Sequence, residues 1–288
     1  MGSKIIQRLE LALRVKKPTP GEVLEQVSTR GVLRGPVDWV FPGWMLYVEY
    51  VTQKIAETFQ LSEGEKSLLH FRDAMKQLLL EAWMQTKEKL TSVYNAIVED
   101  TYRLEGNRLY APDGTWMYLD ETMRISIRGV NAVTQFPDVL KLPREKLELF
   151  QLGWRASDEG EIGGRPAMGT TQPWQAFAWI AVRCGELRIR VDSVNLTREG
   201  VSVAVYLRAN SWRQRWSKDE AISLVADYLR RGEWGPPLAA WLGDGNARWS
   251  KVLRGKYVVS IAAKEPWRLG LVASTYEALV ATGRRRRL

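Results

Sequence analysis

Cysteine and histidine are almost absent from the sequence. The 288 residues include one cysteine, Cys184, and one histidine, His70. A single cysteine excludes a disulfide framework and a cysteine-based zinc cluster, and a single histidine excludes a histidine-rich metal site. A metal ion bound by this chain would therefore need carboxylate ligands, which favour a hard cation such as Mg²⁺. His70 lies inside a predicted helix, where we expect a packed or surface side chain rather than a metal ligand.

Long apolar runs are also lacking. The N-terminal stretch MGSKIIQRLELALRVKK has no uninterrupted apolar core of signal-peptide length. The most apolar run, residues 37–51, is too short to span a bilayer and contains Pro42 and Glu49. These features predict a cytoplasmic protein without a membrane partner.

Acidic residues are the minority charge. The chain has 33 Asp and Glu against 42 Lys and Arg, a net charge of +9 at pH 7, and arginine is twice as frequent as lysine. Basic proteins attract polyanions, and neutralising phosphates releases counterions, which supplies affinity that does not depend on base sequence. Arginine adds a planar fork of donors that suits phosphates and guanine edges. The composition therefore favours a polyanionic partner such as nucleic acid, although many basic proteins bind none.

The first half of the chain, residues 1–145, is predicted to be mainly helical with a β-hairpin. A turn at 42–43 precedes a helix over 44–59, and a capping box at 62–65 opens a long amphipathic helix. Alternating strands flank the Pro-Asp-Gly turn at 112–114. Because this half shows no catalytic constellation, we interpret it as a helical packing or partner-binding module.

The second half, residues 146–288, contains two helices that end alike. The first reads GWRASD at 153–158 and the second reads AAWLGD at 239–244, so each has two small residues four positions apart and then an acid, Asp158 or Asp244. Residues four apart share a helix face, and small ones let a partner backbone approach closely. Two helices packed through these faces would bring both acids together, an arrangement suited to a divalent cation. Helix capping explains either acid alone but not the shared spacing.

The parallel between the two copies continues downstream. A Pro-Trp pair at 173–174 corresponds to one at 266–267, and each begins an apolar helix that closes at Gly185 or Gly283. The second copy stops there, so residues 186–231 have no counterpart. Either a homodimer or another protein partner completes the truncated copy, or the N-terminal half does, or the truncation marks decay of the fold.

The two helices and the strands that follow them resemble the LAGLIDADG homing endonucleases and related maturases. LAAWLGDG at 238–245 is close to a common variant of that motif, whereas GWRASDEG at 153–160 departs from it because Glu159 stands where the motif has glycine. The resemblance covers residues 147–288. We also expect a relationship to a multicopy, repeat-encoded family of archaeal proteins that carry degenerate forms of this fold.

This resemblance implies an α+β fold in which an αββαββα unit and a truncated second copy follow the N-terminal region. In the family, the two motif helices pack together, antiparallel sheets lie in the DNA major groove, and the final acid of each motif helps to hold divalent ions at the scissile phosphates. Carried over, Asp158 and Asp244 become catalytic residues and Mg²⁺ ligands, with Glu159 as the alternative to Asp158. Metal-bound water would be the nucleophile.

Two predicted strands indicate nucleic-acid binding independently of the family. In ELRIRVDSV and GVSVAVYLRAN, apolar side chains alternate with basic or polar ones. Side by side, the strands would present four side chains suited to phosphates and base edges, Arg188, Arg190, Tyr206 and Arg208. Solvated strands also often carry arginine, so an ordinary surface is the alternative interpretation.

Further cations follow in the second copy. We expect a loop or hairpin to carry four nucleic-acid-binding candidates, Arg248, Lys251, Arg254 and Lys256. Loop cations are commonly only solvated charges. Lys264 lies where a strand returns towards the motif helix, which makes it the candidate for an active-site cation. The run RRRR at 284–287 indicates a basic tail that contacts phosphates nonspecifically.

Three functions remain open at the level of sequence. The chain is a DNA-binding protein that cleaves DNA with Mg²⁺, or a non-catalytic DNA- or RNA-binding module of maturase-like or domesticated type, or a structural or interaction protein without nucleic acid. Only the first requires Mg²⁺ and both acids, and the third predicts no affinity above that of any basic protein. Nucleic-acid binding is favoured because helix capping alone does not explain the likeness of the two copies. Both share the spacing of their small residues, the acid that follows, and a Pro-Trp pair downstream.

Overall fold

The computed structural model describes four stretches of the chain, residues 2–61, 65–119, 123–250 and 256–261. The chain divides into two compact units of helices and antiparallel strands, as expected of an α+β protein. Unit 1 comprises Met1–Val139 and Gly169–Ser211, and unit 2 comprises Leu140–Met168 and Trp212–Leu288. The units are interleaved along the sequence, whereas the sequence suggested one division at residue 145.

Five helices belong to the described part of unit 1. Their bounds are α1 Gly2–Leu13, α2 Pro20–Arg30, α3 Val37–Phe59, α4 Glu65–Val98 and α6 Pro173–Val182. Helix α6 begins at Pro173 as predicted, because proline fits a first helical position whose N–H has no helical partner. The first residues of the capping box predicted at 62–65 lie outside the described residues. No helix in the described ranges combines the length and the hydropathy that spanning a bilayer requires.

Helix α3 overturns the predicted turn at residues 42–43. The helix starts after Pro36 and runs unbroken through Pro42. A proline inside a helix removes one hydrogen bond and costs about 3 kcal/mol. Trp39, Phe41 and Trp44 are at most 3% exposed, and each such burial contributes roughly 1.5–3 kcal/mol. The prediction was wrong because the burial of these side chains outweighs the local preference of the Pro-Gly pair.

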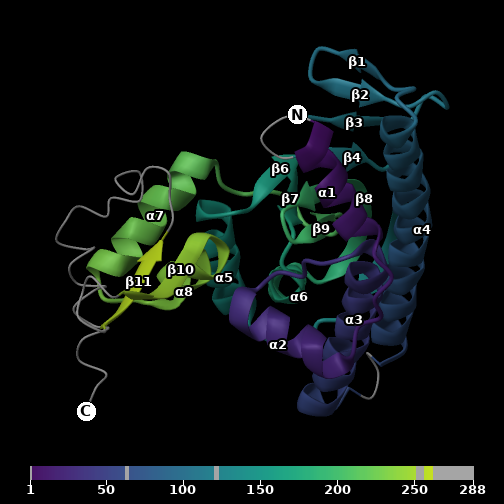
Figure 1. The fold of residues 1–288 in the computed structure, drawn as a ribbon. Coiled ribbons are helices and arrows are strands. Elements are labelled where there is room, and N and C mark those ends of the chain that lie inside the picture. The colour runs from purple at the N-terminus through teal and green to yellow at the C-terminus, as the bar shows by residue number, and fades with distance from the viewer. Residues whose placement is uncertain (1, 62–64, 120–122, 251–255, 262–288) are drawn as a thin grey trace. The chain divides into compact units, whose positions relative to one another are not determined.

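The strands of unit 1 form an antiparallel sheet (Figure 1). Their bounds are β1 Arg103–Glu105, β2 Arg108–Tyr110, β3 Trp116–Tyr118, β4 Met123–Ser126, β5 Asn131–Phe136, β8 Gly185–Thr197 and β9 Gly200–Ala209. Hydrogen bonds join them in the order β1-β2-β3-β4-β8-β9, and β5 also pairs with β8. Strand β8 pairs with β5 along residues 185–190 and with β4 along residues 193–196. These pairings explain why residues 169–211 belong to unit 1.

The hairpin predicted around residues 112–114 is confirmed, with β2 and β3 paired on either side. Gly114 donates its N–H to the carbonyl oxygen of Ala111 at 3.0 Å. Its φ of +83° lies in the left-handed region, which glycine adopts without strain. The carboxylate of Asp113 accepts the backbone N–H of Thr115 at 2.8 Å and so fixes the turn.

One face of the unit 1 sheet is buried. A row of facing residues crosses five strands, each at most 2% exposed: Leu109, Met117, Ile125, Val194 and Val203. Helix α4 contacts β3, β4, β5 and β8, and helices α1, α3 and α6 contact β9. The buried row therefore lies beneath these helices. Side chains of the opposite parity form the second face, which carries the binding residues predicted on β8 and β9.

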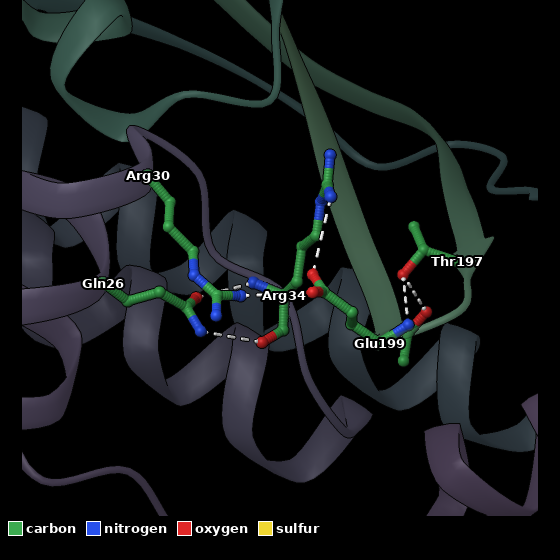
Figure 2. A network of polar contacts seen from close by, with 6 residues as sticks. Gln26, Arg30, Arg34, Thr197 and Glu199 are labelled. Carbon is green, nitrogen blue, oxygen red and sulfur yellow. Dashed lines mark hydrogen bonds and ion pairs between the residues drawn. The ribbon is translucent and has the colours of Figure 1, made fainter. Parts of the chain in front are cut away.

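A polar network fastens the α2–α3 connection to the β8–β9 turn (Figure 2). Glu199 in the turn accepts hydrogen bonds from Arg30 at 3.3 Å and from Arg34 at 3.5 Å. The side chain of Gln26 accepts the N–H of Arg34 at 2.8 Å and donates to its carbonyl oxygen at 3.1 Å. The hydroxyl of Thr197 accepts the N–H of Glu199 at 3.1 Å. Since the ion pairs are exposed, the network positions the connection more than it stabilises the fold.

Unit 2 is built around three helices and two hairpins. The bounds are α5 Arg144–Ala156, β6 Gly160–Ile162, β7 Arg165–Thr170, α7 Lys218–Arg230, α8 Gly235–Asp244, β10 Gly245–Ser250 and β11 Lys256–Ile261, and the last two residues of β7 belong to unit 1. Strand β6 pairs with β7, and β10 pairs with β11. The helices enclose a small core of Leu152, Ala156, Ala221, Ile222, Val225 and Ala240. The chain order α5-β6-β7-α6-β8-β9-α7 has the element types of the expected αββαββα succession, but α6, β8 and β9 belong to unit 1, so these elements do not form one compact unit.

Candidate functional site

Helices α5 and α8 pack through the small residues that the sequence singled out. A Cβ atom placed on Gly153 would lie 2.5 Å from the Cβ of Ala239 and 2.8 Å from the backbone nitrogen of Ala240. The same atom would overlap the carbonyl oxygen of Pro236. Any side chain at position 153 would therefore push the two helix backbones apart. The close packing expected from the spacing of small residues is observed.

The C-terminal ends of these two helices also meet. A Cβ atom placed on Gly243 would overlap the hydroxyl of Ser157, and it would lie 3.2 Å from the backbone nitrogen of Asp158. Gly153 contacts the first half of α8 and Gly243 contacts the end of α5, so the helices run parallel. Asp244 is the last residue of α8. The backbones of Asp158 and Asp244 are therefore brought close together.

The two carboxyl groups that follow α5 differ in their surroundings. The side chain of Asp158 is exposed, whereas Glu159 is only 1% exposed. Glu159 accepts a hydrogen bond from Nε2 of Gln214 at 2.7 Å, and its N–H donates to the carbonyl oxygen of Trp154. Glu159 is thus a buried, hydrogen-bonded carboxylate. Between the two acids considered for the first motif, the geometry favours Asp158 as the one that can reach a ligand from solvent.

Sequence reasoning missed a cation at the end of α5. Lys218, the first residue of α7, donates from Nζ to the carbonyl oxygen of Ser157. A positive charge at a helix C-terminus stabilises the carbonyl groups that end the helix, and this one lies beside Asp158. The capping box at 217–220 marks Lys218 as a helix start but gives no sign of its contact with α5. Lys264, the cation predicted from sequence, lies outside the described residues.

The two acids predicted to bind a divalent cation, Asp158 and Asp244, lie at or just after the ends of α5 and α8. Mg²⁺ is commonly held by one or two carboxylates together with waters and substrate phosphates. Asp158 is exposed, whereas the side chain of Asp244 lies outside the described part of the structure, so joint binding of Mg²⁺ by the two acids stays a prediction. Among the side chains that the structure describes, which do not include that of Asp244, no group of three or more His, Cys, Asp and Glu residues is arranged to hold a metal ion. His70 lies exposed on α4, a surface side chain as expected.

The β8–β9 basic patch comprises Arg188, Arg190, Tyr206 and Arg208. Arg188 faces Arg208 and Arg190 faces Tyr206 across the two antiparallel strands. The four side chains therefore share one face of the sheet, as the alternation predicts. The opposite face holds alternating buried residues, Leu187, Ile189, Val205 and Leu207.

Asparagine side chains hold two of the arginines in this patch. Nη2 of Arg188 donates to the side-chain oxygen of Asn131 on β5 at 3.2 Å. Nε of Arg208 donates to the side-chain oxygen of Asn210 at 2.9 Å. An arginine has five N–H donors, so these bonds orient each guanidinium while others remain for a ligand.

The other two members of the patch contact each other. The guanidinium carbon of Arg190 lies 5.4 Å from the ring centroid of Tyr206, and its Nε lies 3.0 Å from the carboxylate of Asp192. The Tyr206 ring lies against Gly169, where an added Cβ would be 2.7 Å from the ring. The absence of a side chain at Gly169 thus leaves room for this ring on the sheet face.

Two of the four basic candidates predicted after α8 lie on the β10–β11 hairpin. Arg248 is part of β10, and Lys256 is the first residue of β11. Lys251 and Arg254 lie outside the described residues, as does the basic tail at 284–287. The role of these cations in binding nucleic acid stays a prediction.

Sequence reasoning also missed a group on the sheet face of unit 1. The β2–β4 aromatic cluster comprises Arg108 and Tyr110 on β2, Trp116 and Tyr118 on β3, and Arg124 on β4. Arg108 faces Tyr118, which in turn faces Arg124. The hydroxyls of Tyr110 and Tyr118 accept hydrogen bonds from Arg108 at 3.4 and 3.1 Å, which raises the pKa of its guanidinium. The signal available in the sequence was the recurrence of aromatic and basic residues at alternate positions of this hairpin.

Comparison with known proteins gives no family for the chain. No family model matches the sequence, and no curated protein or solved structure is significantly similar to it. The resemblance to LAGLIDADG proteins therefore rests on the motif helices and strands of the chain itself.

Proposed function

We propose that the chain binds nucleic acid, with double-stranded DNA as its main partner and RNA as the alternative, through the β8–β9 basic patch. The observation that carries this proposal is the strand register that sets three arginines and a tyrosine on one sheet face. Guanidinium forks suit phosphates and base edges, and strands are among the elements that proteins place in DNA grooves. The net charge of +9 adds long-range attraction for a polyanion.

The orientation of the arginines supports a binding face over an ordinary solvated surface. Arg188 and Arg208 each bond an asparagine side chain, and Arg190 lies over the ring of Tyr206. Side chains that are already held lose less conformational freedom when they bind a ligand.

Duplex binding by a double variant tests the proposal. We expect Arg188→Ala/Arg208→Ala to weaken binding of a DNA duplex and to reduce the slope of log K against log salt concentration by about 2, because each phosphate contact contributes about 1. The matched control is Arg144→Ala/Arg231→Ala, which removes equal charge from two exposed arginines that pair with glutamates. Fluorescence anisotropy over a salt series measures both quantities. The proposal would be overturned if both double variants lost the same amount of duplex affinity, or if the wild type did not bind the duplex.

Mg²⁺-dependent DNA cleavage at the ends of α5 and α8 is a second candidate function. One observation favours it, the parallel packing through Gly153 and Gly243 that brings the backbones of Asp158 and Asp244 together. This packing agrees with what the resemblance to LAGLIDADG endonucleases implies. The two carboxylates would hold Mg²⁺, which when bound stabilises negative charge on phosphate oxygens. A cleavage assay with variants of both acids tests this function.

A further inference from the structure

The β2–β4 aromatic cluster contains aromatic rings beside its arginines, and phosphate binding alone does not need such rings. The rings of Trp116 and Tyr118 have centroids 4.6 Å apart at an interplanar angle of 88°, and the rings of Tyr110 and Trp116 are 6.5 Å apart. The guanidinium carbon of Arg108 lies 4.8 Å from the Trp116 centroid and 5.0 Å from that of Tyr118. That of Arg124 lies 4.7 Å from the Tyr118 centroid. Three rings and two guanidinium groups thus form one contiguous surface.

This cluster lies on the accessible face of the sheet. Arg124 is exposed, and the other four members of the cluster are partly exposed. The alternate residues Leu109, Met117 and Ile125 fill the buried face. Cation–π contacts at an exposed site stabilise a fold only weakly. The rings therefore leave aromatic surface in water that a ligand can cover.

The sheet face around the cluster carries an excess of positive charge. The pairing registers place six arginines on it: Arg103, Arg108, Arg124, Arg188, Arg190 and Arg208. Three carboxylates lie on it or beside it among the described residues: Glu105, Glu186 and Asp192. Two of the three already pair with arginines of the same face. The charge of this face complements a polyanion.

We propose that the β2–β4 aromatic cluster binds unpaired nucleotides of a nucleic-acid strand, whose bases stack on Tyr110, Trp116 and Tyr118 while neighbouring arginines contact the phosphates. The inference rests on the proposed function and extends it from duplex to single-stranded nucleic acid. Every base has a π face, so stacking does not depend on sequence. Known sites for single strands combine aromatic rings with a basic surface, as this face does.

The sheet connects the cluster with the β8–β9 basic patch. Arg124 on β4 faces Asn195 on β8, and Asn195 faces Ser202 on β9, so the two groups lie on the same face of one sheet, with the buried Ser202 four positions along β9 from Tyr206. Strands in a sheet are about 4.8 Å apart, so four spacings separate β2 from β9 by roughly 19 Å. One nucleic-acid molecule that carries both paired and unpaired segments can contact both groups.

Binding of a labelled oligothymidylate, measured by anisotropy, tests the proposal. Trp116→Leu and Tyr118→Leu keep an apolar side chain but remove the ring, and we expect each to lower affinity for the single strand by about 5- to 150-fold, with duplex affinity changed less than about twofold. Tyr118→Phe keeps the ring and should bind as the wild type does. Trp234→Leu is the matched control, because Trp234 is an exposed tryptophan in unit 2.

The outcomes separate this proposal from the proposed function. Leucine variants that bind the oligothymidylate like the wild type would show that the cluster is not a stacking surface, whereas duplex binding through Arg188 and Arg208 would stand. If the leucine variants lost affinity for the duplex and for the single strand equally, the cluster would be part of the duplex site, and the single-strand inference would be overturned. A wild-type protein that binds neither nucleic acid would refute both. Circular dichroism of each variant confirms that it is folded.

Discussion

Cys184, the single thiol of the chain, follows helix α6 in unit 1. Burial raises its pKa to about 11, and the negative charge of Asp138 acts in the same direction. The thiolate is the form that reacts with alkylating reagents, and an ordinary cysteine has a pKa of about 8.5. At about pH 8 we therefore expect iodoacetamide to modify the folded protein on the order of 100-fold more slowly than an unperturbed cysteine. The rate should rise about tenfold per pH unit up to roughly pH 10.

Mass spectrometry of the intact protein after timed exposure measures the alkylation rate of Cys184 at each pH. Protein unfolded in urea is the control, and its rate should level off near the ordinary cysteine pKa. A folded-state rate that levels off in the same range would contradict the raised pKa. Because the folded thiol holds its proton more tightly than the unfolded one, this group stabilises the fold below about pH 8.5 and loses that contribution as the pH rises through its folded value.

The alternation of apolar and polar residues along a strand predicts the sheet face of some candidate site residues but not of others. Strands β8 and β9 are long, so the shared face of Arg188 and Tyr206 is predictable from parity alone. Strands β2 and β3 have three residues each, too few for alternation to stand out. The β2–β4 aromatic cluster depends on the register of β2, β3 and the four-residue β4, and the lengths of the turns between these strands set that register.

At the scale of elements, the spacing of small residues predicts the packing of α5 on α8. A Cβ on Gly153 would meet backbone atoms of Pro236 and Ala240, so we expect Gly153→Ala to destabilise the protein by about 1–3 kcal/mol. In an unpacked helix the same change stabilises by about 1 kcal/mol, because alanine has the higher helix propensity. Gly235→Ala is the control, since nothing lies within 4 Å of an added Cβ there. Urea denaturation followed by circular dichroism measures both variants, and a Gly153→Ala protein at least as stable as the wild type would refute the close packing.

Other elements depend on contacts that no local pattern shows. The Pro-Gly pair at 42–43 suggests a turn, and only the burial of Trp39, Phe41 and Trp44 makes the helix continue. The contact of Lys218 with the end of α5 joins residues 61 positions apart in the sequence. The start of α6, the hairpin turn at 112–114 and the faces of β8 and β9 depend on local patterns, and these are the features that could be predicted.

At the scale of the whole molecule, the sequence indicates the α+β class but not the grouping of elements into units. Strand β8 pairs with β4 and β5, which lie far before it in the sequence: Phe136 is opposite Gly185, 49 positions later, and Met123 is opposite Leu196, 73 positions later. Such pairings depend on the hydrophobic faces of several elements together and leave no mark in any one segment. Two consecutive domains were therefore expected, whereas the two units are interleaved.

The two proposed activities lie on different units, so single substitutions should separate them. We expect the wild type to nick supercoiled plasmid in the presence of Mg²⁺. Under the proposal the two carboxylates hold the cation and the β8–β9 basic patch holds the DNA, so Asp158→Asn or Asp244→Asn should reduce nicking to background while duplex affinity stays unchanged. Asp227→Asn makes the same change at an exposed aspartate of unit 2 and should leave nicking intact. Glu159→Gln should nick as the wild type does, since Glu159 is buried and bonded to Gln214.

Agarose gels of plasmid incubated with and without Mg²⁺, together with anisotropy of each variant, measure cleavage and binding separately. Salt-sensitive binding without nicking by the wild type would assign the chain to the non-catalytic binders. Nicking that persists in both aspartate variants would place the reaction elsewhere in the protein and leave Asp158 and Asp244 as packing positions at two helix ends. If Asp158→Asn lost both nicking and duplex binding, the carboxylate of Asp158 would contribute to holding the DNA. That result would contradict the assignment of cleavage to unit 2 and of DNA binding to unit 1.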